Sequence, residues 1–101
     1  MTEIKINKNN NKIENITISG HTGYKSNGLD IVCASVSSIA ITTINAILRY
    51  NDKSLEYDEA DGLLKIDIVY HDDVIDILLD NMIDLLNELT KQYPKNVKIN
   101  N

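Results

Sequence analysis

Short runs in which apolar and polar residues alternate open the chain, a pattern typical of strands with one buried face. One run covers Glu3–Asn7, where Ile4 and Ile6 alternate with Lys5, and the next covers Ile13–Ser19, where Ile16 and Ile18 alternate with Thr17. The segment between them is rich in asparagine, which favours a turn. The sequence therefore predicts a β-hairpin at the start of the chain.

A long uncharged run, Ile31 to Leu48, predicts the first helix. Asp30 would open this helix, as its cap or in its first turn, and the helix would end near Arg49. Apolar residues lie almost all round it, so we expect it to be covered on more than one face. The run also holds six Ser, Thr or Asn residues. It is therefore typical of a buried helix rather than of a membrane span.

The second half of the chain repeats the order of two strands and a helix. Strands are predicted at Ser54–Asp58 and Leu63–Tyr70, with Asp61-Gly62 between them as the turn. Leu64, Ile66, Ile68 and Tyr70 would share one face of the second of these strands.

A strong apolar stripe then predicts a second, amphipathic helix. It would begin at Asp72 or Asp73, and Pro94 bars its continuation. Val97–Ile99 reads as a last short strand. The order ββαββαβ predicts one small α+β domain over residues 1–101, in which a largely buried first helix packs with the second helix against short strands.

Composition narrows the classes of function. The net charge is −5 and only one arginine is present, which argues against direct nucleic-acid binding. The single cysteine excludes an internal disulfide and a cysteine-based zinc site, and it points to a reducing compartment. No signal peptide opens the sequence, so we expect a cytoplasmic protein without membrane contact. The two histidines and the scattered acids show no metal-binding spacing, so neither metal nor cofactor is predicted.

A row of acidic residues runs along the predicted second helix, at Asp76, Asp80, Asp84 and Glu88. Such a row is usually a solvated face, and the alternative is a docking strip for a basic partner. His71 precedes this helix and is expected in a turn or at the surface.

The segment that carries chemistry runs from Gly20 to Ser37. Three glycines in the nine residues from Gly20 to Gly28 predict a loop, and this loop holds His21. Twelve residues after His21, Cys33 falls near the start of the first helix.

That placement suggests an activated nucleophile. Near a helix start, the dipole and the unpaired N–H groups favour thiolate and stabilise a developing oxyanion. A loop of this length allows His21 to reach the sulfur of Cys33, which would form a Cys–His pair. The alternative is that Cys33 is a small buried hydrophobe, the common state of cysteine, or that His71 is the base.

Two stretches of the chain resemble the signature of the ribosomal-processing cysteine protease family, Prp. They are Gly20-His21-Thr22-Gly23-Tyr24 and Gly28-Leu29-Asp30-Ile31-Val32-Cys33-Ala34-Ser35-Val36-Ser37. A weaker match is Gln92-Tyr93-Pro94 followed by Val97. Thr22 stands where alanine is commoner in the family, and Asn96 stands where an aromatic residue is usual.

The resemblance implies a cysteine endopeptidase that removes a short N-terminal extension from a large-subunit ribosomal protein. It also implies a homodimer. By matching positions, Cys33 is the nucleophile and His21 is the general base and then the acid.

The resemblance also implies supporting residues. Asp30 would cap the helix or orient His21, and Ser37 would either assist catalysis or bond back to the Cys33 carbonyl. Gly20, Gly23, Tyr24 and Gly28 would form a substrate loop, with Gly23 and Gly28 as hinges. Tyr24 would cover an aromatic side chain of the substrate, or simply pack.

Two other classes of function remain as alternatives at this point. One is a non-catalytic, ribosome-associated module that grips the extension without cutting it. The other is a thiol redox sensor that uses Cys33, although the chain has no second cysteine to resolve an oxidised one.

Overall fold

The computed structural model describes residues 1–20 and 29–100. In this part of the chain the elements follow the predicted order ββαββαβ. They are β1 (Thr2–Asn9), β2 (Lys12–Ser19), α1 (Leu29–Tyr50), β3 (Leu55–Ala60), β4 (Leu63–Ile68), α2 (Asp73–Gln92) and β5 (Val97–Asn100).

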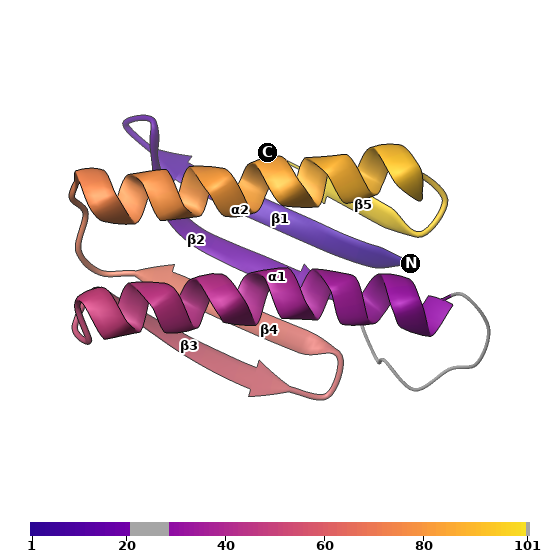
Figure 1. Cartoon of the computed structure of the whole chain (residues 1–101), viewed down its shortest axis with the longest axis horizontal. Helices are drawn as coiled ribbons and strands as arrows, with labels where there is room; N and C mark the ends of the chain where they lie inside the picture. The colour runs from indigo at the N-terminus through magenta and orange to yellow at the C-terminus, as the bar shows by residue number, and fades with distance from the viewer. Residues whose placement is uncertain (21–28, 101) are drawn as a thin grey trace.

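The strands form one sheet in the order β3-β4-β2-β1-β5 (Figure 1). The neighbours β3 and β4, β4 and β2, and β2 and β1 are antiparallel, whereas β1 and β5 run parallel. The first strand is therefore internal to the sheet, between its hairpin partner and the strand that lies furthest along the chain.

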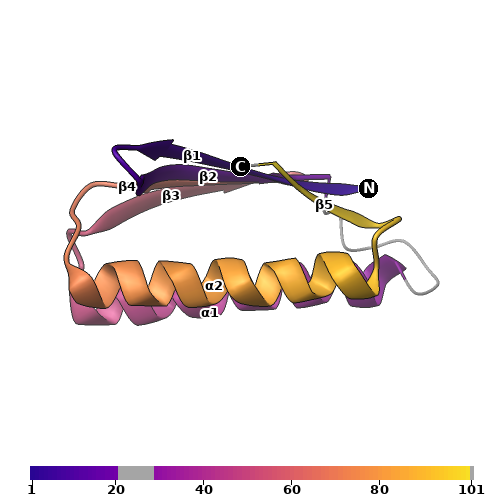
Figure 2. The ribbon, with the colours of Figure 1, turned by 90° about the horizontal axis from the view of Figure 1, so that it is seen from above.

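Both helices lie on the same side of the sheet, so the molecule has two layers (Figure 2). Isoleucines of β1 and β2, such as Ile4 and Ile16, are fully buried between the layers. Buried residues of both helices, such as Val36 and Met82, belong to the same cluster. Because neither Phe nor Trp is present, this core is built from aliphatic side chains.

The two predicted turns, between β1 and β2 and between β3 and β4, contain residues with positive φ, and the residue types found there accept that conformation. Asn10 and Asn11 connect β1 to β2 with φ angles of 54° and 64°. Among residues with a side chain, asparagine is one of the few that accepts this left-handed conformation readily. Gly62 serves the turn between β3 and β4 with φ of 69°.

Helix α1 buries one face against the sheet, with Val32, Val36, Ala40, Ile44 and Ile47 all nearly inaccessible. The sequence predicted that more than one face of this helix would be buried. The structure buries a narrower part of its surface, since flanking residues such as Ile39 are only partly buried and Ile31 is 65% exposed. By length and composition alone, Ile31–Tyr50 is apolar enough to cross a membrane. In this fold the helix is instead part of the core layer.

Strand β4 is shorter than the sequence predicted. It ends at Ile68, and Tyr70 is 49% exposed rather than on the buried face with Leu64 and Ile66. The backbone N–H groups of Val69 and Tyr70 both donate to the carbonyl of Ser54, which turns the chain out of the sheet. This turn leads directly to α2.

Helix α2 begins and ends where the sequence indicates. Asp72 is its N-cap, and its carboxylate accepts a hydrogen bond of 2.9 Å from the N–H of Ile75. The second carboxylate oxygen accepts from the hydroxyl of Tyr50 at the end of α1, which ties the two helices together. Gln92 is the last helical residue before Pro94.

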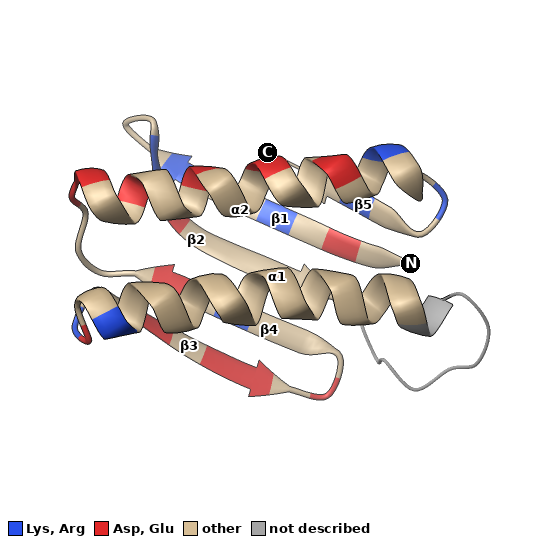
Figure 3. Ribbon diagram, in the orientation of Figure 1, with Lys and Arg blue, Asp and Glu red and all other residues tan. Residues whose placement is uncertain are grey.

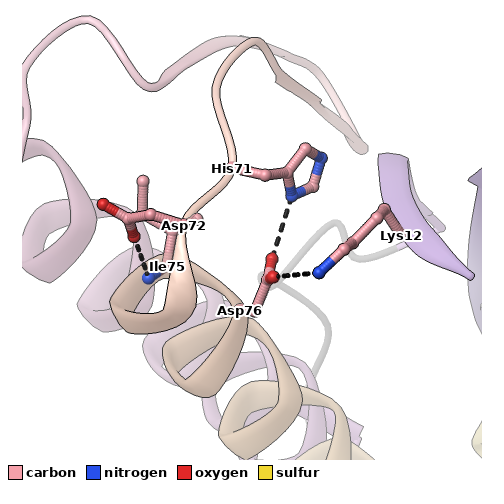
Figure 4. A network of polar contacts seen from close by, with 5 residues as sticks. All are labelled: Lys12, His71, Asp72, Ile75 and Asp76. Carbon is pink, nitrogen blue, oxygen red and sulfur yellow. Dashed lines mark hydrogen bonds and ion pairs between the residues drawn. The ribbon is translucent and has the colours of Figure 1, made fainter.

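The first residue of the acidic row is engaged in a polar network (Figure 4). Lys12 donates to one oxygen of Asp76 at 2.7 Å, and Nδ1 of His71 lies 2.9 Å from the other oxygen. Lys12 first, and then His71, lower the pKa of Asp76 below its usual value. The remaining three residues of the row, Asp80, Asp84 and Glu88, are exposed along α2 (Figure 3).

This network predicts a pH-dependent contribution to stability. Because the folded-state pKa of Asp76 lies below the unfolded value of about 3.9, its carboxylate stabilises the fold above that pH, and the gain is lost as the pH falls through the folded-state pKa. We expect Asp76→Asn to lower the free energy of unfolding by about 0.5–1 kcal/mol at neutral pH.

Urea unfolding across the pH range measures this effect. The difference between Asp76→Asn and the native chain should shrink as the solution is acidified from about pH 5 toward pH 2. Asp84→Asn, an exposed position on the same helix, is the matched control and should change little. An equal loss in both variants would contradict the proposed role of the network.

Candidate active site

Cys33 lies on α1 near the end of the molecule where that helix starts. It is the fifth residue of α1, is half-buried, and is a free thiol. With a cap at Asp30, one of the two placements that the sequence allowed, Cys33 would lie in the first turn, but α1 already begins at Leu29. Cys33 therefore lies in the second turn, beyond the first few N–H groups that have no partner within a helix. The predicted help from those groups is correspondingly weaker.

The sulfur of Cys33 meets a polar atom of the sheet. Its Sγ lies 3.7 Å from Oγ1 of Thr2, the first residue of β1, within the range of a sulfur hydrogen bond. Thr2 is only 2% exposed, whereas Cys33 is half-buried. Cys33 as a residue is therefore not enclosed in the aliphatic core, which is compatible with a functional role for this cysteine.

Gly20 brings the end of β2 against the start of β1. It has φ of 84°, and its N–H donates to the carbonyl of Gly62 at 2.8 Å. A Cβ atom at this position would lie 2.4 Å from the carbonyl oxygen of Met1. Only glycine fits such a conformation and such an approach. The requirement for glycine here is thus a packing requirement between two strands.

Several predicted site residues fall outside the described part of the chain. His21, Gly23, Tyr24 and Gly28 belong to residues 21–28, and the side chain of Asp30 is also outside it. The backbone of Asp30 is the second residue of α1, which fits the first-turn alternative and not the cap.

Ser37 follows Cys33 by one helical turn and is half-buried, on the same side of α1. Back-bonding of the kind considered for it does occur nearby. The hydroxyl of Ser35 donates to the carbonyl of Ile31, and that of Thr43 donates to the carbonyl of Ile39, both at 2.9 Å.

His71 is not placed to serve Cys33. It lies just before α2, and its neighbour Asp72 is bonded to Tyr50 at the far end of α1. Seventeen residues of helix separate Cys33 from Tyr50, which is about 25 Å. Figure 1 shows the start of α1 and the start of α2 at opposite ends of the molecule. The reading of His71 as a rival base is therefore wrong.

Thr2 is the residue near the sulfur that sequence reasoning missed. The predicted strand Glu3–Asn7 leaves Thr2 outside it, whereas β1 begins at Thr2. The signal that would have found it is parity, since Thr2, Ile4 and Ile6 occupy alternate positions and all three are buried. Within residues 1–20 and 29–100, no three His, Cys, Asp or Glu side chains gather as a metal site would require.

Comparison with known proteins adds independent information. A sequence model described as cysteine protease Prp matches residues 1–98. A curated relative, the ribosomal processing cysteine protease Prp of Staphylococcus aureus strain Mu50, is 27% identical over 92 residues, which cover 88% of this chain and 87% of the relative.

Solved structures agree with the fold. A crystal structure of the ribosomal processing protease Prp from S. aureus with a substrate peptide has a TM-score of 0.90 and 24% identity, and covers 99% of this chain and 98% of that one. The same S. aureus protease with a covalently linked product peptide has a TM-score of 0.88 and 26% identity, with the same coverage.

The close approach at Gly20 gives a testable prediction. Gly20→Ala should lower the free energy of unfolding by at least about 1–2 kcal/mol, because a side chain there meets both an unfavourable φ and the Met1 carbonyl. Gly62→Ala shares the positive φ and serves as the comparison. Denaturant unfolding should show the larger loss at Gly20, and an equal or smaller loss there would contradict the proposed clash.

Proposed function

The chain belongs to the cysteine protease Prp family, and from this premise we propose that it is a ribosomal processing cysteine protease with Cys33 as its nucleophile and His21 as its base. The observation that carries the proposal is the family match over residues 1–98, which includes every residue of the proposed site. The comparisons do not favour a non-catalytic binding module or a redox sensor.

The substrate is a ribosomal protein with a short N-terminal extension, and we propose that it belongs to the large subunit. The name of the S. aureus relative supports ribosomal processing, and the peptide-bound S. aureus structures support a peptide substrate. The large-subunit assignment rests on the resemblance of the two motifs, Gly20–Tyr24 and Gly28–Ser37.

The chemistry follows from the two residue types. His21 takes the proton of the Cys33 thiol, and the thiolate attacks the scissile carbonyl carbon. The carbon–nitrogen bond breaks, the imidazolium of His21 protonates the leaving amine, and an acyl-enzyme remains. Water then attacks the thioester while His21 takes its proton, and the carbon–sulfur bond breaks. The covalently linked product in the S. aureus structure is consistent with such a covalent route.

The described residues support His21 as the partner of Cys33. Gly20, which directly precedes His21 in the sequence, packs against the carbonyl of Met1. Thr2, which follows Met1 in the sequence, contacts the sulfur of Cys33. The chain therefore enters the segment containing His21 from a point beside the nucleophile.

The other site residues have supporting roles in this proposal. Asp30 lies three residues before Cys33 and Ser37 four residues after it, so both share its side of α1. Asp30 would orient His21, and Ser37 would support the reacting groups. Gly23, Tyr24 and Gly28 would form the substrate loop with Gly20, and Tyr24 would cover an aromatic side chain of the peptide.

Replacement of the proposed pair tests the function. Cys33→Ser and His21→Ala should each lower kcat/KM by at least about 10³-fold, because each removes a group that acts in bond making or proton transfer. The assay is cleavage of a synthetic peptide that spans the junction between extension and mature ribosomal protein, followed by mass spectrometry.

His71→Ala is the matched control, since this histidine lies at the far end of α1 and faces Asp76. Its activity should stay within a few fold of the native protein. Full activity in Cys33→Ser would end the proposal, and a loss in His71→Ala as deep as in His21→Ala would remove the assignment of the base.

We also propose a cytoplasmic homodimer. Maturation of ribosomal proteins takes place where ribosomes are assembled, which sets the compartment. The dimer rests on the family resemblance and is supported by exposed apolar residues on the helix layer. An open hollow between α1 and α2 is lined by Ile31, Ala34, Ser35, Ser38, Ile39 and Leu89.

The mass in solution checks the dimer. Light scattering should give twice the chain mass of 11.4 kDa. Ile31→Lys, which places a charge on an exposed apolar position of this hollow, should shift the mass toward that of one chain. A native protein that stays at 11.4 kDa at micromolar concentration would contradict the proposal.

A further inference from the structure

The Thr2 hydroxyl is one of two polar side chains that the described residues bury almost completely, the other being Ser54. The Ser54 hydroxyl has a structural partner, the carbonyl of Asn51 at 2.7 Å. The Thr2 hydroxyl instead lies against the sulfur of Cys33 at 3.7 Å, across the boundary between the sheet and α1. A buried hydroxyl aimed at a side chain of the proposed site calls for a role there.

The backbone around Thr2 is held by the neighbouring segments on either side of β1 within the sheet. Its N–H donates to the carbonyl of Asn96 at 2.8 Å, and it pairs with Val97 on β5. Next to it, the carbonyl of Met1 is packed against Gly20. Because threonine is branched at Cβ, its own side chain also has few rotamers. The hydroxyl is therefore fixed in space before any substrate arrives.

The bond between the two side chains changes character when the sulfur loses its proton. With a neutral thiol, either group can donate to the other. With a thiolate, only the Thr2 hydroxyl can donate, and the bond becomes charge-assisted and stronger. Thr2 thus interacts more favourably with the thiolate form of Cys33 than with the neutral thiol form.

We infer that Thr2 is a positioning residue for the nucleophile: its buried hydroxyl donates to the Cys33 thiolate and holds Sγ in one orientation at the start of β1. This inference rests on the proposed function of Cys33. Thr2 reaches the reaction only through the sulfur, and its contribution should fall on the reactivity of that sulfur rather than on peptide binding.

Alkylation of Cys33 by iodoacetamide, followed across pH without any substrate, tests the inference directly. Two pairs of proteins differ by the hydroxyl alone: native Thr2 against Thr2→Val, and Thr2→Ser against Thr2→Ala. In each pair the chain without the hydroxyl should be alkylated about 3- to 10-fold more slowly near neutral pH.

Peptide cleavage gives the second readout. Loss of the hydroxyl should lower kcat and leave KM within about twofold, and Thr2→Ser should retain most of the native kcat. Circular dichroism and thermal unfolding establish that each variant is folded. If Thr2→Val does not fold, the Ser and Ala pair decides the question by itself.

The outcomes separate cleanly. Identical alkylation profiles within both pairs would overturn the role of Thr2. Equal impairment of Thr2→Ser and Thr2→Ala, with native behaviour in Thr2→Val, would assign the effect to packing of the methyl group, which only the native chain and Thr2→Val carry. Because alkylation needs no protease activity, a failure of Cys33→Ser to abolish cleavage would remove the proposed function while leaving the measured contact intact.

Discussion

One-sided burial of aliphatic side chains is the constraint on which this fold depends. A single sheet face meets two helices, and isoleucine, leucine and valine supply most of the contact. Since side chains alternate between the two faces of a strand, a slip of one residue in β1 would turn Ile4 and Ile6 to solvent. The same slip would turn Thr2 away from Cys33. The parity that buries the core therefore also places a hydroxyl beside the proposed nucleophile.

The two ends of the molecule have different tasks. At one end, Asp72 joins the helices through Tyr50, and Asp76 joins α2 to the first hairpin through Lys12. At the other end, the sulfur of Cys33 lies against the start of β1. Contacts of charged side chains thus fasten the end where α1 finishes and α2 begins, about 25 Å of helix away from the thiol of Cys33.

Much of the fold could be predicted because its signals are local. Alternation marked β1 and β2, and two asparagines marked a turn that needs positive φ. The apolar stripe and the Asp72 cap marked α2. The parallel pairing of β1 with β5 could not be predicted in this way, because neither strand's own pattern specifies its partner. Tyr70 kept the alternation of β4 but left the sheet, since backbone bonds to Ser54 turn the chain there.

The candidate site was proposed from its residue types, and one residue of its surroundings was missed. Cysteine near a helix start and histidine in a glycine-rich loop are visible in the sequence. The exact start of α1 was not, because Asp30 suited either a cap or the first turn, and the structure agrees with the first turn. Thr2 was overlooked because threonine is a polar residue and was not expected to face the core. Its inward direction follows only from the register of β1 in the sheet.

The pairing of β1 with β5 also orders events during folding. The amide of Asn100 donates to the carboxylate of Glu3, which is 97 positions away in the sequence. Contacts between such distant segments form late, because closing a loop of nearly the whole chain loses conformational entropy before the contacts provide any stabilisation. Thr2 takes its N–H partner from Asn96 in that same closure. A chain in which β1 and β5 have not yet paired therefore lacks the Asn96 bond that fixes Thr2 beside the sulfur of Cys33.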